Sequence, residues 1–195
     1  MGRETVQGAT IKAVLDADVL YALPLRDTLL SAAVEGCFIP LWNDQILDEA
    51  IRNLLADQRL SSGGAQSLRK ALDTHFADAL VEGYRPLIAK MRNHPKDRHV
   101  AACAAAAQAN YIVTGNLRDF EHLPEGIEAI HPDNFLRKLL DQAPDKLRAA
   151  LIAQSARLKH PPLDVAAIID LLVPVSPSFA KAWREAEAMR APPRA

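Results

Sequence analysis

The chain has 195 residues, of which 49% are hydrophobic and 24% charged, a composition typical of a globular protein. Its formal net charge of −1 predicts no overall attraction to nucleic acid. No apolar run approaches the roughly 20 residues of a membrane helix, no segment is typical of a signal peptide, and the two cysteines lie in apolar surroundings. We therefore expect a cytoplasmic protein with both thiols reduced in its core.

Charge is unevenly distributed along the chain. Residues 1–135 carry 13 Lys and Arg against 18 Asp and Glu, whereas residues 136–195 carry 10 against 6. The first part is therefore suited to holding cations, and the second part to meeting an anionic partner.

Short apolar runs alternate with stretches of helical periodicity over the first part of the chain. Strands are expected at 11–15, 37–41, 111–114 and 128–130. Helices are expected at 25–35, 44–57, 65–75 and 97–107, with Asn43 as a cap and a turn at 61–64. This alternation predicts an α/β fold with a parallel sheet.

After residue 131 the sequence predicts helices and no strand. They are expected at 132–141, 144–158, 164–172 and 177–190. Pro132, Pro144 and Pro177 each stand where a first helical residue is expected. We therefore predict two domains, an α/β domain at 1–135 and an all-helical C-terminal extension at 136–195.

Asp16 is the first candidate functional residue. It follows the apolar run that ends at Leu15, so a strand there would place it at the carboxyl edge of a parallel sheet, where ligands bind. A carboxylate at that edge is suited to holding a hard cation such as Mg²⁺. The alternative is that Asp16 only caps the following helix.

Further oxygen-bearing side chains stand at or near helix starts. Glu49 lies beside the buried stripe of its helix, and Asp97 stands at a helix N-terminus. Asn116 and Asp119 follow the strand that ends near residue 114. Each has an alternative interpretation, as a solvated helix acid, a helix cap or residues of a plain turn respectively.

Four sequence segments together resemble a PIN-domain nuclease. They occur in the order of that family and are closest to the VapC-like toxins of bacterial toxin–antitoxin pairs. The segments are Val-Leu-Asp-Ala-Asp-Val-Leu, Ile-Leu-Asp-Glu-Ala, Pro-Lys-Asp-Arg-His-Val-Ala-Ala and Ile-Val-Thr-Gly-Asn-Leu-Arg-Asp-Phe.

The resemblance implies a PIN-like α/β fold, with a small parallel sheet flanked by helices, and a Mg²⁺-dependent or Mn²⁺-dependent endoribonuclease. It implies catalytic and metal-binding roles for Asp16, Glu49, Asp97 and Asp119, with Asn116 as a further metal ligand. Its implied partners are an RNA substrate and a cognate antitoxin protein.

Two positions depart from the family pattern. Asp18 stands where the family usually has Asn, Ser or Thr, and Asn116 stands where many members have Asp. Both changes bear on whether the site holds one metal ion or two. His99 is interpreted as structural, with contact to substrate as the alternative.

The basic extension has two interpretations. Its leucines and isoleucines are numerous enough for the helices simply to cover the sheet or form a homodimer surface. We predict that it also helps to bind RNA, because contacts to phosphate supply affinity independent of sequence. The residues assigned to RNA binding are Lys146, Arg148, Arg157 and Lys159.

Two other functions are considered. One is an RNA-binding or RNA-processing PIN protein with no toxin role. The other is a phosphatase, because the Asp16-Ala17-Asp18 pattern is similar to that of the haloacid dehalogenases, although Leu20 stands where those enzymes have Thr or Val.

Overall fold

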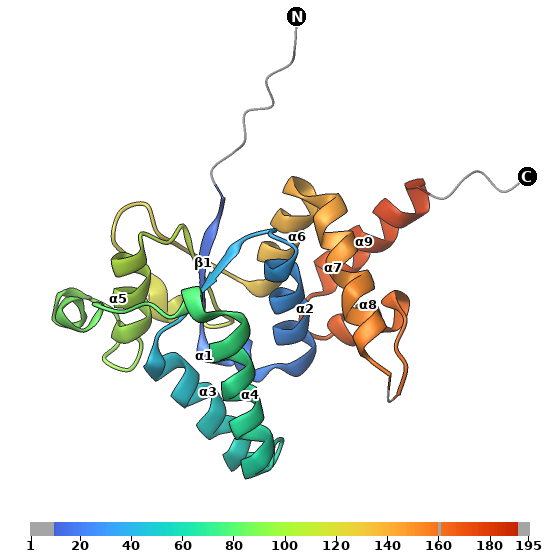
Figure 1. Ribbon diagram of the computed structural model, residues 1–195. Coiled ribbons are helices and arrows are strands. Elements are labelled where there is room, and N and C mark those ends of the chain that lie inside the picture. The colour runs from blue at the N-terminus through green and yellow to red at the C-terminus, as the bar shows by residue number, and fades with distance from the viewer. Residues whose placement is uncertain (1–9, 160, 191–195) are drawn as a thin grey trace, which may run out of the picture.

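The computed structural model describes residues 10–159 and 161–190 (Figure 1). Within them, one sheet of parallel strands has the order β2-β1-β3-β4. The strands are β1 (Lys12–Leu15), β2 (Ile39–Leu41), β3 (Tyr111–Val113) and β4 (Glu128–Ile130). Because β1 pairs with both β2 and β3, the residues that follow β1 and β3 emerge side by side at the carboxyl edge.

The helices agree closely with those expected, and the α/β prediction is confirmed. They are α1 (Ala17–Tyr21), α2 (Leu23–Val34), α3 (Asp44–Ala56), α4 (Ser62–His75), α5 (Arg98–Ala107), α6 (Pro132–Gln142), α7 (Pro144–Arg157), α8 (Val165–Leu172) and α9 (Pro177–Arg190). Short 3₁₀ turns occur as η1 (Ala77–Ala79), η2 (Arg85–Lys90) and η3 (Leu117–Phe120).

Two local features differ from expectation. Helix α1 starts directly after Asp16 and is not among the helix ranges expected from the sequence, although a helix cap at Asp16 was the alternative interpretation. The predicted turn at 61–64 is wrong, because Ser61 caps α4 by accepting a hydrogen bond from the Gly64 amide at 3.1 Å. That cap satisfies an amide that the helix leaves free, so the glycines are accommodated in its first turn.

Helices cover both faces of the sheet (Figure 1). Helix α5 packs on β1 and β3, and its run of fully buried small residues allows close approach. On the other side, Phe135 of α6 packs edge-on against Phe38 with ring centroids 5.0 Å apart, and lies 6.0 Å from the ring of Tyr111. These aromatic contacts join α6 to the strands that it covers.

The C-terminal helices form a further layer outside α2 and α6 (Figure 1). Helix α7 packs on α2, and α9 packs on α6. Pro132, Pro144 and Pro177 are the first residues of their helices, as expected. Helix α6 itself crosses the predicted domain boundary at residue 135, and buried residues on both sides of that boundary belong to one hydrophobic cluster. The division into two domains stays a prediction.

Both cysteines are buried and free, as the sequence predicts. Among the described residues, no helix combines the length and the apolar character needed to cross a membrane.

Asp133 joins the extension to the sheet-covering helix α6. It is 7% exposed, and its two carboxylate oxygens accept hydrogen bonds from the backbone amides of Phe179 at 2.7 Å and Ser178 at 3.2 Å. Both amides belong to the first turn of α9, where the helix provides no acceptor. A side chain of one helix therefore caps another.

We predict that Asp133→Ala lowers the free energy of unfolding by about 2 kcal/mol, because two hydrogen bonds to a charged group are lost. Urea denaturation followed by circular dichroism measures the change. Asp141→Ala on the exposed side of the same helix is the matched control and should have little effect. Equal effects of the two substitutions would contradict the capping role.

Candidate acidic site

Asp16 lies at the carboxyl end of β1 and is fixed by contacts to the end of β3 and to the start of α1. Its backbone amide donates to the Val113 carbonyl of β3 at 3.1 Å. One carboxylate oxygen accepts from the Ala17 amide at 2.7 Å, and the other accepts from the Thr114 hydroxyl at 2.9 Å. Asp16 therefore does cap α1, but the contact from Thr114 orients the carboxylate beyond what a cap requires.

Asp18 and Gly115 meet beside Asp16. The Gly115 amide donates to a carboxylate oxygen of Asp18 at 2.8 Å. A Cβ atom at position 115 would lie 2.8 Å from that same oxygen, which is closer than side-chain carbons approach. A side chain at position 115 would therefore have to displace the Asp18 carboxylate from the Gly115 amide.

Asp97 occupies the N-cap position of α5 but makes no side-chain capping hydrogen bond, so the capping alternative is not supported. Its carboxylate instead lies 3.7 Å from Nδ1 of His94. Burial raises the pKa of Asp97, and the charges of Asp119 and Glu49 raise it further. Asp97 therefore faces other carboxylates.

Glu49 projects from α3 beside His99 of α5. Its Oε2 lies 3.7 Å from Nε2 of His99, and its side chain is 46% exposed. Burial lowers the pKa of His99, which favours the neutral imidazole. The buried Asn43 side chain accepts from the Ile46 amide, as its predicted cap role requires, and donates to the His99 carbonyl at 2.9 Å. Asn43 thereby ties α3 to α5.

Asn116 and Asp119 form one unit after β3. The Asn116 side-chain amide donates to the Asp119 carboxylate. The buried Asn93 donates to the backbone carbonyl of Asp119 at 2.9 Å, and it was not among the expected site residues. The sequence shows only an asparagine four residues before Asp97, and its burial became visible in the structure alone.

Negative charge connects these positions. Burial raises the pKa of Asp16 to about 7, the charge of Asp18 adds to this, and Asp97 contributes a smaller rise. Hydrogen bonds from Thr114 and the Ala17 amide act in the opposite direction. The fold therefore brings acids from four separate parts of the chain close enough to affect one another's ionisation.

The donor set suits a hard cation. No group of three or more His, Cys, Asp or Glu residues within 10–159 and 161–190 is arranged so that it could hold a metal ion. Mg²⁺ usually keeps several water ligands and takes only one or two carboxylates, so such a closed cage is not required. The crowded carboxylate oxygens and the raised pKa of Asp16 fit a divalent cation that would neutralise them.

Lys146, one of the residues predicted to bind RNA, lies away from this edge. Its ammonium group donates to the Gly36 carbonyl at 3.1 Å. Gly36 lies between α2 and β2, at the amino edge of the sheet, whereas Asp16 lies at the carboxyl edge. The structure therefore does not bring Lys146 and Asp16 together.

The other basic residues predicted to bind RNA also have local contacts. Arg148 pairs with Glu187 of α9, and Arg157 donates to the Ser31 hydroxyl of α2 at 2.6 Å. Lys159 takes part in an isolated backbone bridge after α7. Their contact with RNA stays a prediction, and two of these side chains serve packing between helices.

Comparison with known proteins identifies two regions of similarity. Residues 12–118, more than half of the chain, match the PIN domain family, and residues 132–185 match the VapC50 C-terminal domain family. The chain is 38% identical over 122 residues to the Mycobacterium tuberculosis protein named "Putative ribonuclease VapC50". That alignment covers 61% of this chain and 70% of the relative.

We predict that Asp16→Asn stabilises the metal-free protein more strongly as pH rises. The folded protein retains the Asp16 proton up to about pH 7, whereas the unfolded chain releases it near 3.8. Ionising Asp16 therefore opposes folding, an effect that is absent below about pH 4 and grows through pH 7. The advantage of the variant should increase by about 4 kcal/mol between pH 4 and pH 8.

Urea unfolding in EDTA at several pH values measures this difference. Asp48→Asn is the matched control, because Asp48 is exposed and pairs with Arg69 outside the site. An advantage of Asp16→Asn that does not change with pH would contradict the raised pKa.

Proposed function

Because the chain belongs to the PIN-domain family, we propose that it is a divalent-metal-dependent endoribonuclease and the toxin of a toxin–antitoxin pair. The observation that carries the proposal is the gathering of acids around Asp16 at the carboxyl edge of the sheet. The match of residues 132–185 to the VapC50 C-terminal domain supports a toxin of that type. The family assignment replaces the phosphatase interpretation.

Asp16, Glu49, Asp97, Asn116 and Asp119 would hold one or two Mg²⁺ or Mn²⁺ ions. Such an ion supplies a water molecule that is nucleophilic near neutral pH and stabilises charge on the leaving oxygen of a phosphodiester. The oxygen-rich side chains are the ligands that these cations prefer.

The residues of the chain prepare that site. Thr114 and the Ala17 amide hold the Asp16 carboxylate in one orientation, and Asn116 does the same for Asp119. His99, which burial keeps neutral, lies beside Glu49 without adding a competing positive charge. A preorganised set of oxygens lowers the reorganisation needed during reaction.

Two macromolecular partners follow from the proposal. RNA is the substrate, and a separate antitoxin protein binds the toxin and blocks cleavage. A basic antitoxin side chain placed among the carboxylates would compete with the metal for them. We infer that the protein acts in the cytoplasm, where RNA is available, and that the extension provides a homodimer surface.

We predict that Asp16→Asn lowers the rate of RNA cleavage by about 100-fold or more, since removing even a supporting contact of a metal site costs about 10-fold to 100-fold. Asp97→Asn should behave in the same way. Gel analysis of a labelled RNA with Mg²⁺, and with EDTA as a blank, measures the rate.

Asp48→Ala is the control for this experiment. It removes a neighbouring carboxylate that pairs with Arg69, and it should retain most activity. An Asp16→Asn protein that cleaves RNA at the parent rate would contradict the metal-site assignment, and so would full activity in EDTA.

We predict that expression without a partner slows bacterial growth and that co-expression of the cognate antitoxin restores it. Growth curves and total RNA profiles measure both effects, with Asp16→Asn as the inactive control. If the purified protein cleaves RNA while its expression leaves growth and RNA profiles unchanged, an RNA-processing role replaces the toxin role.

A further inference from the structure

Several cationic side chains near the acidic site have no carboxylate partner among the described residues. Many arginines on the surrounding helices pair with carboxylates, as in α4, α7 and α9. By contrast, Lys90, Arg92 and Arg118 are exposed and form no ion pair with any residue of 10–159 or 161–190. These cations are therefore available to an anion from outside the chain.

Two hollows adjoin one another at these cations. A hollow of about 210 Å³ reaches Asp119 and is lined by Arg92, His94, Arg118 and His122 among others. A second, of about 340 Å³, also includes Arg92 and His122 in its lining. Arg92 and His122 belong to both linings, so the two hollows are neighbours, and only the first includes Asp119 in its lining. We refer to these two neighbouring hollows together as the track.

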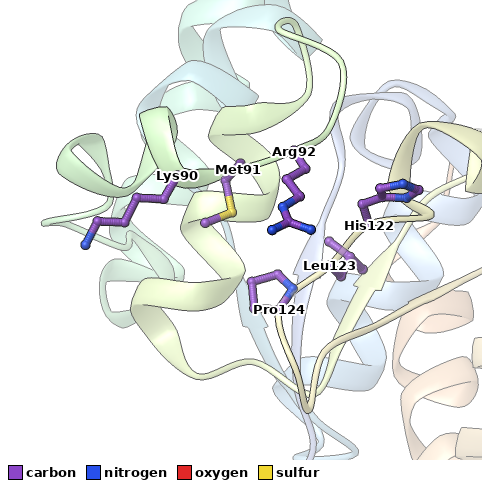
Figure 2. A pocket seen from close by; sticks show the side chains of 6 residues that line it. All are labelled: Lys90, Met91, Arg92, His122, Leu123 and Pro124. Carbon is purple, nitrogen blue, oxygen red and sulfur yellow. The ribbon is translucent and has the colours of Figure 1, made fainter.

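The second hollow combines cations with an apolar surface. Figure 2 shows the guanidinium of Arg92 pointing toward Leu123 and Pro124, while the Lys90 side chain extends away from the others. Met91 lies between these two basic residues. The lining of the second hollow thus places the positive charge of Arg92 next to non-polar side chains.

The segment at residues 92–94 is held against the acidic site by the buried Asn93. Asn93 is 5% exposed and donates to the Asp119 carbonyl, and its own carbonyl accepts from Arg98 at 3.0 Å. Because Asn93 is anchored inward, its neighbours Arg92 and His94 are left exposed on the surface. The position of the cations relative to Asp119 is therefore set by buried contacts.

We propose that the two hollows bind an unpaired nucleotide of the RNA beside the bond that is cleaved, an inference that rests on the proposed function. Arg92 and Arg118 contact phosphates, and the base lies against His122 with Leu123 and Pro124 beneath it. A volume of about 340 Å³ is within the range of small-ligand sites, about 300–1,000 Å³. Proteins commonly recognise RNA by stacking unpaired bases on such rings.

Electrostatics favour RNA over an acidic protein segment at this surface. The acids around Asp16 repel phosphate, so a substrate that approaches them needs positive charge close by. Arg92 and Arg118 supply it at the Asp119 side of the site, whereas Arg148 of the extension is already paired with Glu187. The track therefore supplies the positive charge that an RNA phosphate needs beside the acidic site, whereas Arg148 of the extension does not.

The test measures binding of a short fluorescein-labelled single-stranded RNA to the full chain in EDTA, with Asp16→Asn to prevent cleavage. Adding Arg92→Gln and Arg118→Gln should weaken binding about tenfold at low salt and flatten the plot of log K against log[salt] by about 1.4. His122→Ala should weaken binding by about fivefold or more without changing that slope. Arg137→Gln with Lys70→Gln, which alters two exposed unpaired cations elsewhere, should change neither quantity.

The requirement for an unpaired base is tested with modified RNA. A set of RNAs is compared, each lacking the base at one position. The RNA that lacks the base bound by His122 should bind more weakly than the others. With that RNA, His122→Ala should cause no further loss of affinity. A blunt duplex of the same sequence should bind more weakly than the single strand. Equal affinity for the duplex and the single strand would overturn the proposal that the site binds an unpaired nucleotide.

A folded Arg92→Gln, Arg118→Gln protein that keeps parental RNA affinity and salt dependence would overturn the proposal and leave the surface to a protein partner. This outcome is distinct from failure of the proposed function, which is an otherwise unmodified protein that does not cleave RNA with Mg²⁺. In the cleavage assay, the proposal requires the double variant to raise KM more than it lowers kcat.

Discussion

The carboxylate of Asp16 ionises only near pH 7 because it is desolvated and lies beside Asp18. The arrangement is held in place by hydrogen bonds from Thr114 and the backbone, and by the central position of β1 between β2 and β3. A protein with no ligand for this edge would be more stable with a neutral residue there. Keeping a carboxylate at such a cost in stability is consistent with a proposed role for Asp16 in binding a cation, since stability is often given up where activity needs it.

The positive charges of the chain differ in whether a carboxylate pairs with them. One group, typified by Arg148 with Glu187, joins helices of the extension and is already neutralised. The other group, with Arg92 and Arg118, flanks the acids and has no carboxylate partner among the described residues. Net charge and regional charge alone do not separate these groups, because what matters is which cations remain unpaired after folding.

Much of the fold was predictable because its signals are local. Proline at the first position of α6, α7 and α9, and the apolar runs that became β1, β3 and β4, depend on a few neighbouring residues. Asp16 was also identified from its place after a strand. Even so, local reasoning missed α1 and misjudged Ser61, because several residue types are equally common in turns and helix caps.

The sequence by itself determined the order of strands and helices, the acids at their ends and the start of each C-terminal helix. Only the tertiary structure decided which of these residues meet. Thr114 reaches Asp16 across 98 positions, and Asn93 reaches Asp119 across 26. It also decided that Lys146 contacts Gly36 at the amino edge of the sheet while Arg92 and Asp119 line the same hollow. Such contacts depend on packing between distant segments, which neither periodicity nor composition encodes.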